Sequence, residues 1–130
     1  MNEYDEKKLS SIKTMQMILE DAKGIIKGSK GESRKNLPTN SDARESLKKK
    51  LMAISEICST MKDIHQQGKY FSLIGKSGDF FSLIDESISY SINDLDKDEN
   101  PFSGLSLEKL MTTINLVIAL LKKWSKELEK

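Results

Sequence analysis

Four stretches of the chain repeat apolar residues at every third or fourth position, the spacing that places side chains on one face of an α-helix. This pattern predicts helices over residues 2–27, 42–67, 79–95 and 106–129, with a short helical turn over 70–74. No stretch alternates apolar and polar residues convincingly, so we expect no sheet. The 130 residues therefore predict a single all-α domain, a four-helix antiparallel bundle.

The predicted helix ends follow capping signals. Asp42, Asp79 and Ser106 are suitable N-cap residues, because a side-chain oxygen there accepts a backbone N–H that lacks a helical partner. Gly28 and Gly68 stand where helices commonly end. Residues 28–41 are polar, lack periodicity and contain two glycines and a proline, so we expect a long mobile loop between the first two helices.

The predicted core consists of the periodic apolar residues of each helix. Each set lies on one helical face, and together the four faces are wide enough to build one core. The four sets are Ile12, Met15, Ile18, Leu19, Ala22 and Ile26; Leu47, Leu51, Ile54, Ile57, Cys58, Met61 and Ile64; Phe81, Ile84 and Ile88; and Leu107, Leu110, Met111, Ile114, Val117, Ile118, Leu121 and Leu128.

A second apolar row distinguishes the last predicted helix. Leu116, Leu120 and Trp124 recur at every fourth position and lie apart from that helix's core face. Two arrangements fit this pattern. In one the helix is central and the other three cover it, which would bury Leu116. In the other the row binds a partner, with a partly exposed Trp124 as an anchor of the type enriched at binding hot spots.

Composition and charge narrow the classes of function. The formal net charge of +1 argues against a strongly basic nucleic-acid binder and against an acidic tail. A single cysteine cannot form an internal disulfide, which favours a reducing compartment. The N-terminus does not resemble a signal peptide, and the longest apolar run, Leu116 to Leu121, is far shorter than a membrane span. We therefore expect a cytoplasmic protein without a membrane partner.

Basic residues concentrate in the first half of the chain and form a candidate anion-binding set. Three lie in the predicted loop and four near the start of the second helix: Lys30, Arg34, Lys35, Arg44, Lys48, Lys49 and Lys50. Consecutive lysines point around more than half of a helix, and no aromatic residue interleaves them as in single-strand binders. A solvated face is the simpler interpretation, and an anionic partner is the alternative.

Three patterns resemble catalytic or metal-binding motifs without completing them. Gly75-Lys76-Ser77 resembles the end of a phosphate-binding loop, but Tyr70 stands where the first glycine is needed. The alternating acidic residues from Asp94 to Asn100 lack the glycine and glutamate of a calcium loop. Cys58 and His65 lie two turns apart and could form a thiol nucleophile or half a metal site, although a buried structural cysteine is far commoner.

These observations predict no enzyme, no metal, no cofactor and no small-molecule substrate. The leading hypothesis is a non-enzymatic protein–protein interaction module (an adaptor, a chaperone-like protein or a regulatory bundle). Its partner would be another protein or a second copy of itself, bound through Leu116, Leu120 and Trp124. The alternatives are a small nucleic-acid-associated regulator that uses the basic set, and a thiol enzyme that uses Cys58 and His65.

Overall fold

The computed structural model describes residues 3–29, 37–66, 75–97, 101–102 and 104–129, and the other residues lie outside the description. Within these ranges all regular secondary structure is helical. The four helices are α1 (Glu3–Ser29), α2 (Leu37–Gln66), α3 (Gly75–Lys97) and α4 (Gly104–Glu129).

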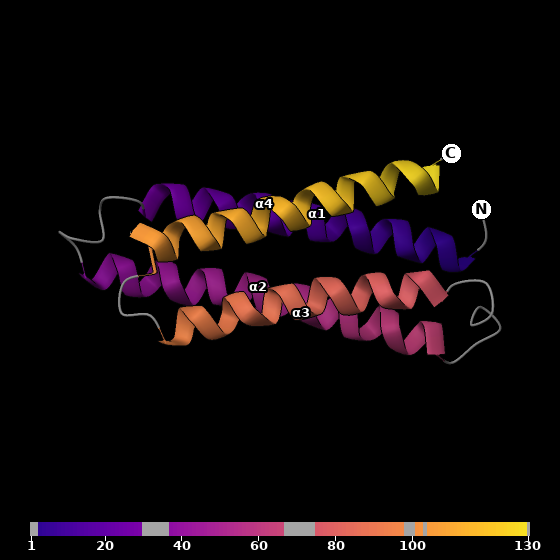
Figure 1. Cartoon of the computed structure of the whole chain (residues 1–130), viewed down its shortest axis with the longest axis horizontal. Helices are drawn as coiled ribbons and strands as arrows, with labels where there is room; N and C mark the ends of the chain where they lie inside the picture. Colours follow the sequence, from indigo (N-terminus) through magenta and orange to yellow (C-terminus); the bar gives the residue numbers. More distant parts are fainter. Residues whose placement is uncertain (1–2, 30–36, 67–74, 98–100, 103, 130) are drawn as a thin grey trace.

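The helices form a bundle in which each runs antiparallel to the one before it (Figure 1). Helix α1 packs against α2 and α4, and α3 packs against the same two helices. The order around the bundle is therefore the order along the chain, and the two termini lie at the same end. The predicted four-helix antiparallel bundle is confirmed.

Each predicted helix is shorter than the helix in the structure. Helix α1 continues through Gly28 to Ser29, and α2, α3 and α4 begin at Leu37, Gly75 and Gly104. The N-caps predicted at Asp42, Asp79 and Ser106 are therefore wrong, because these residues lie inside helices.

These errors arose because glycine and proline were interpreted as ends of helices. Proline is well tolerated in the first turn of a helix, where its missing N–H would have no helical acceptor, and Pro38 lies in the first turn of α2. A glycine costs only about 1 kcal/mol in a helix that packing stabilises. The turn over 70–74, Gly68 and the connection over 30–36 lie outside the described residues, so the predicted turn and mobile loop stay predictions.

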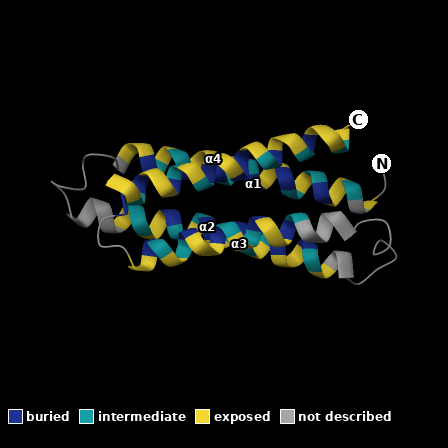
Figure 2. Ribbon diagram, viewed as in Figure 1, coloured by how far each residue is buried: buried dark blue, intermediate teal, exposed yellow. Residues whose placement is uncertain are grey.

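The core lies where the four apolar faces meet (Figure 2). Most residues of the predicted sets are buried, and Ile18, Ile57, Met111 and Leu128 pack partly buried against the same cluster. The side chain of Ile64 is outside the description. Phe102, between α3 and α4, is also fully buried although no periodic pattern marks it.

A polar contact joins α2 to α3 beside this core. The Ser55 hydroxyl donates to Asp85 Oδ1 at 2.7 Å, and Lys62 Nζ donates to Asp85 Oδ2 at 3.0 Å. The Asp85 carboxylate thus accepts two hydrogen bonds from the neighbouring helix. Such a partly buried, satisfied carboxylate favours one alignment of the two helices, because a shift along the axis would leave it unpaired.

Candidate functional site

The second apolar row of α4 does not lie in one environment. Leu116 is 56% exposed, Leu120 is partly buried against the core, and Trp124 is partly buried. The arrangement in which α4 is central and Leu116 is buried is wrong, because α4 occupies a corner of the bundle and packs mainly against α1 and α3. Its core face is already filled by residues such as Ile114 and Leu121, and Leu116 lies nearly opposite that face.

Trp124 closes one end of the seam between α3 and α4. Its ring centroid lies 3.5 Å from that of Phe80 and 5.7 Å from that of Phe81. Lys8 Nζ lies 4.8 Å from the centroid of the same indole, and burial lowers the pKa of this lysine although Asp5 opposes the shift. Trp124 therefore holds three helices together at this end of the bundle.

An ion pair closes the seam at the other end. Lys109 Nζ of α4 lies 3.0 Å from Asp94 Oδ2 of α3. Both side chains are accessible to solvent, so the pair contributes little to the free energy of unfolding. It shows where α3 and α4 meet.

Four apolar side chains lie on α3 and α4 between the residues that form these two contacts. Leu83 follows Phe80 by three residues and Tyr90 precedes Asp94 by four, so both lie on the outer surface of α3, turned towards its α4 side. Leu120 precedes Trp124 by four residues and lies on the α3 side of α4, whereas Leu116, four residues earlier, lies nearly opposite the core face. We call this set, Leu83, Tyr90, Leu116 and Leu120, the α3–α4 face.

The α3–α4 face is apolar and largely uncovered. Leu83 is 50% exposed and Tyr90 is 63% exposed, values comparable to that of Leu116. Of the four neighbouring helix pairs in the bundle, α3 and α4 share the least extensive contact. Leu83 and Tyr90 do not belong to the periodic core face of α3, so the sequence pattern did not predict them as part of a site. Their spacing of seven residues is the signal that could have revealed them.

The basic residues predicted to bind anions are not brought together where the structure describes them. Arg44 donates to the backbone carbonyl of Leu95 at 3.1 Å, which ties it to α3. Lys48 also contacts α3 through Asp96 at 2.7 Å, and this hydrogen bond raises the pKa of the lysine.

The remaining basic residues point elsewhere or cannot be placed. Lys50 lies 3.8 Å from Asp21 of α1, and Lys49 is exposed. Lys30, Arg34 and Lys35 lie outside the described residues. The described members therefore face two different helices and the solvent.

Cys58 lies in the core and contacts another sulfur. Its S–H donates to Met15 Sδ at 3.9 Å, and the side chain is fully buried. Burial, aided by the nearby Asp85 carboxylate, raises the pKa of the thiol to about 12. A thiol of this kind is protonated near neutral pH and is a poor nucleophile. The side chain of His65 is outside the description.

We expect native Cys58 to resist a thiol reagent near neutral pH and to react rapidly once the protein is unfolded. The pKa in the unfolded chain is near the ordinary 9.0, so the unfolded state loses its proton first as the pH rises. Stability relative to a Cys58→Ala control should therefore fall from about pH 9 towards pH 12. Rapid modification of the folded protein at neutral pH would contradict burial of this thiol.

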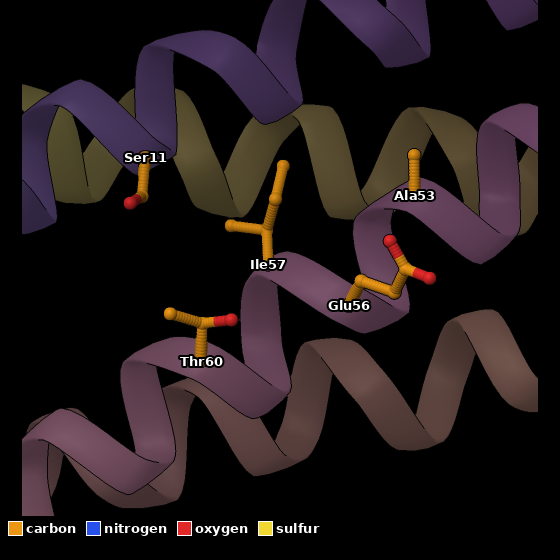
Figure 3. Close-up of a pocket in the computed structure, with 5 residues that line it drawn as sticks. All are labelled: Ser11, Ala53, Glu56, Ile57 and Thr60. Atoms are coloured by element: carbon orange, nitrogen blue, oxygen red, sulfur yellow. The ribbon is translucent and has the colours of Figure 1, made fainter.

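The hollows among the described residues offer little chemistry. One of about 320 Å³ lies between α1 and α2, lined by Ser11 from α1 and by Ala53, Glu56, Ile57 and Thr60 from α2 (Figure 3). Glu56 is its one charged lining residue. Two further hollows share Lys13 and Met17 of α1, and the larger of the two, about 570 Å³, is also lined by Lys122 of α4. No group of three or more histidine, cysteine, aspartate or glutamate residues in the described part of the chain could hold a metal ion.

Helix α4 is long and apolar enough, by length and composition, to cross a membrane, and it alone of the described helices meets this test. The core helix of a bundle can meet the same test. Here α4 buries Leu107, Leu110, Ile114, Val117, Ile118, Leu121 and Ser125 inside the bundle and leaves Leu105 and Leu116 exposed. Its apolar character therefore comes from a core face together with its share of the α3–α4 face.

Comparison with known proteins assigns neither a family nor a function to this chain. The chain matches no protein-family model, and searches of curated proteins and of solved structures find no match. The function proposed below therefore rests on the α3–α4 face and its surroundings.

Proposed function

We propose that this protein is a non-enzymatic protein-interaction module that binds its partner through the α3–α4 face. One observation carries the proposal. Three large apolar side chains, Leu83 and Tyr90 of α3 and Leu116 of α4, are each at least half exposed on the outer surfaces of two neighbouring helices. Single exposed apolar residues are ordinary on a protein surface, whereas a contiguous group of them is typical of an interaction site.

The energetics of burial support this proposal. Full burial of a large apolar side chain is worth about 1.5–3 kcal/mol relative to full exposure, so covering these half-exposed residues recovers part of that free energy each time. A few such residues near the centre of an interface can dominate its affinity. The partly buried Leu120 packs against the core and precedes Trp124 by four residues on α4.

The surroundings of the face support a role in binding rather than in catalysis. Its members carry no acid, base or nucleophile apart from the Tyr90 hydroxyl. The sole cysteine of the chain lies in the core with its thiol protonated near neutral pH. What the face supplies is apolar area.

The experiment compares a face variant with a matched surface control. The face variant carries Leu83→Ser and Leu116→Ser. The control carries Met17→Ser and Met52→Ser, which remove two apolar side chains that are also about half exposed or more, 70% and 48%, from α1 and α2. Circular dichroism should show that both variants fold like the wild type, because all four positions are on the surface.

Binding is then measured by sedimentation of the purified proteins and by co-purification from the cells that produce them. We expect the face variant to lose the assemblies that the wild type and the control form. Assemblies that survive in the face variant, or that both variants lose alike, would overturn the proposed site.

A further inference from the structure

The contacts between neighbouring helices differ in extent around the bundle. Helices α2 and α3 share the most extensive contact, and α3 and α4 share the least extensive one. Because the four helices form a closed ring, a bundle that opens at one contact can keep the other three. Opening between α3 and α4 gives up the fewest packing contacts, so this is where local opening is least costly.

Polar contacts tie α3 to α2 along much of its length. The Asp85 carboxylate accepts two hydrogen bonds from α2, and the Arg44 guanidinium of α2 donates to the backbone carbonyl of Leu95 at 3.1 Å. Lys48 of α2 adds an ion pair with Asp96 at 2.7 Å. These contacts favour a pair of helices that stays together when the rest of the bundle moves.

Helix α4 is tied to α1 in a similar way near the C-terminal end of α4. Lys13 Nζ of α1 lies 3.1 Å from Glu129 Oε1 of α4. Lys8 Nζ of α1 lies 4.8 Å from the centroid of the Trp124 ring. The contact between α1 and α4 is also far more extensive than the contact between α3 and α4. A movement that separates α4 from α3 therefore leaves α4 on α1.

Two contacts join α3 to α4 at opposite ends of their common length. The Lys109–Asp94 ion pair lies near the ends that the chain connects, and its side chains are exposed. At the other end, Trp124 contacts Phe80 and Phe81. Since the chain holds the connected ends together, separation of the two helices is widest at Trp124.

We infer that the bundle has a built-in opening between α3 and α4, with Trp124 as its latch. When the indole leaves Phe80 and Phe81, α4 swings away from α3 with α1, and the α1–α2 contact acts as the hinge. The opening is a property of the free protein and does not rest on the proposed function.

The opening exposes apolar side chains that are otherwise in the core. Ile84 of α3 follows Phe80 by four residues, and Val117 of α4 precedes Trp124 by seven, so each lies on the side of its helix that carries the latch. Both side chains are fully buried in the closed bundle. A thiol at either position therefore reacts only when the bundle opens.

The test compares the reaction of buried thiols with a thiol reagent in the folded protein. Val117→Cys and Ile84→Cys report on the α3–α4 contact, and native Cys58, whose sulfur lies 3.9 Å from Met15 Sδ of α1, reports on the α1–α2 contact in the same molecule. Each rate is divided by the rate of the same thiol in the unfolded chain. We expect the thiols at 117 and 84 to react about tenfold faster than Cys58 or more, because Cys58 stays covered when only α3 and α4 separate.

A Trp124→Leu variant tests the latch. It should raise the rate at 117 relative to Cys58 by about two- to tenfold, the factor that corresponds to a lost aromatic contact. The control is Lys50→Gln, which breaks an exposed ion pair with Asp21 between α1 and α2 and should leave the ratio unchanged. Equal effects of the two variants on this ratio would overturn the latch.

Three results would overturn the opening itself. Equal corrected rates at 117, 84 and 58 would mean that the bundle opens only as a whole. A faster reaction at Cys58 would place the opening between α1 and α2. A fast thiol at 117 with a slow one at 84 would mean that α4 frays alone. Each of these measurements uses the free protein, so failure of this inference is distinguishable from failure of the proposed binding site.

Discussion

Replacement of Ile114 by alanine should lower the free energy of unfolding by about 2–5 kcal/mol, the range found when a large buried side chain leaves a cavity. Ile114 is fully buried in the centre of α4 and belongs to the main core cluster. Denaturant titration followed by circular dichroism measures the change. Ile54→Ala on α2 should behave alike, since Ile54 is equally buried.

Leu116→Ala is the matched control for this prediction. Leu116 lies two residues from Ile114 on the opposite side of α4 and is more than half exposed. Its truncation should change the free energy of unfolding by no more than about 0.5 kcal/mol, as is usual at surface positions. Equal losses at 114 and 116 would mean that α4 is covered on both sides, which contradicts an open α3–α4 face.

Removal of the Asp85 carboxylate should be the next most damaging change. Asp85→Ala leaves the Lys62 ammonium and the Ser55 hydroxyl without their acceptor, in a site where both ion-pair side chains are largely sheltered from water. We expect a loss of about 1–3 kcal/mol, because polar groups that lose a buried partner retain their desolvation cost.

A double-mutant cycle assigns that loss to the contact between α2 and α3. Lys62→Met and the Asp85→Ala, Lys62→Met double variant complete the cycle, and we expect a coupling free energy of about 0.5–3 kcal/mol. The Lys48–Asp96 pair serves as a comparison, because it joins the same two helices at a more exposed position and should couple more weakly. Equal coupling in the two pairs would contradict a special role for Asp85.

Periodicity predicted the core well because burial of apolar area decides which helix face turns inward. Ile12, Leu51, Ile84 and Leu121 were all assigned from their spacing alone and are all fully buried. Helix ends were predicted less well. Glycine and proline are weak stops when packing supports the helix beyond them, as at Gly28 and Pro38.

The candidate site could be predicted only in part. The row on α4 was visible in the sequence, because its spacing of four residues belongs to one helix. Its counterpart on α3 was not, since the meeting of two helix edges depends on how the helices pack. The Phe80–Trp124 contact and the buried Phe102 depend on the same tertiary arrangement and leave no periodic signal.

The central claim is that the α3–α4 face is accessible to solvent in the isolated protein and is covered when a partner binds. The most direct test places a cysteine at the face, as Leu116→Cys, and another outside it, as Met17→Cys, and follows their reaction with a thiol reagent. Native Cys58 provides an unreactive background because it is buried.

We predict that both introduced thiols react rapidly in the free protein, and that a bound partner protects the thiol at 116 but not the one at 17. A thiol at 116 that is unreactive in the dilute free protein, or one that stays fully reactive in the complex, would contradict this account.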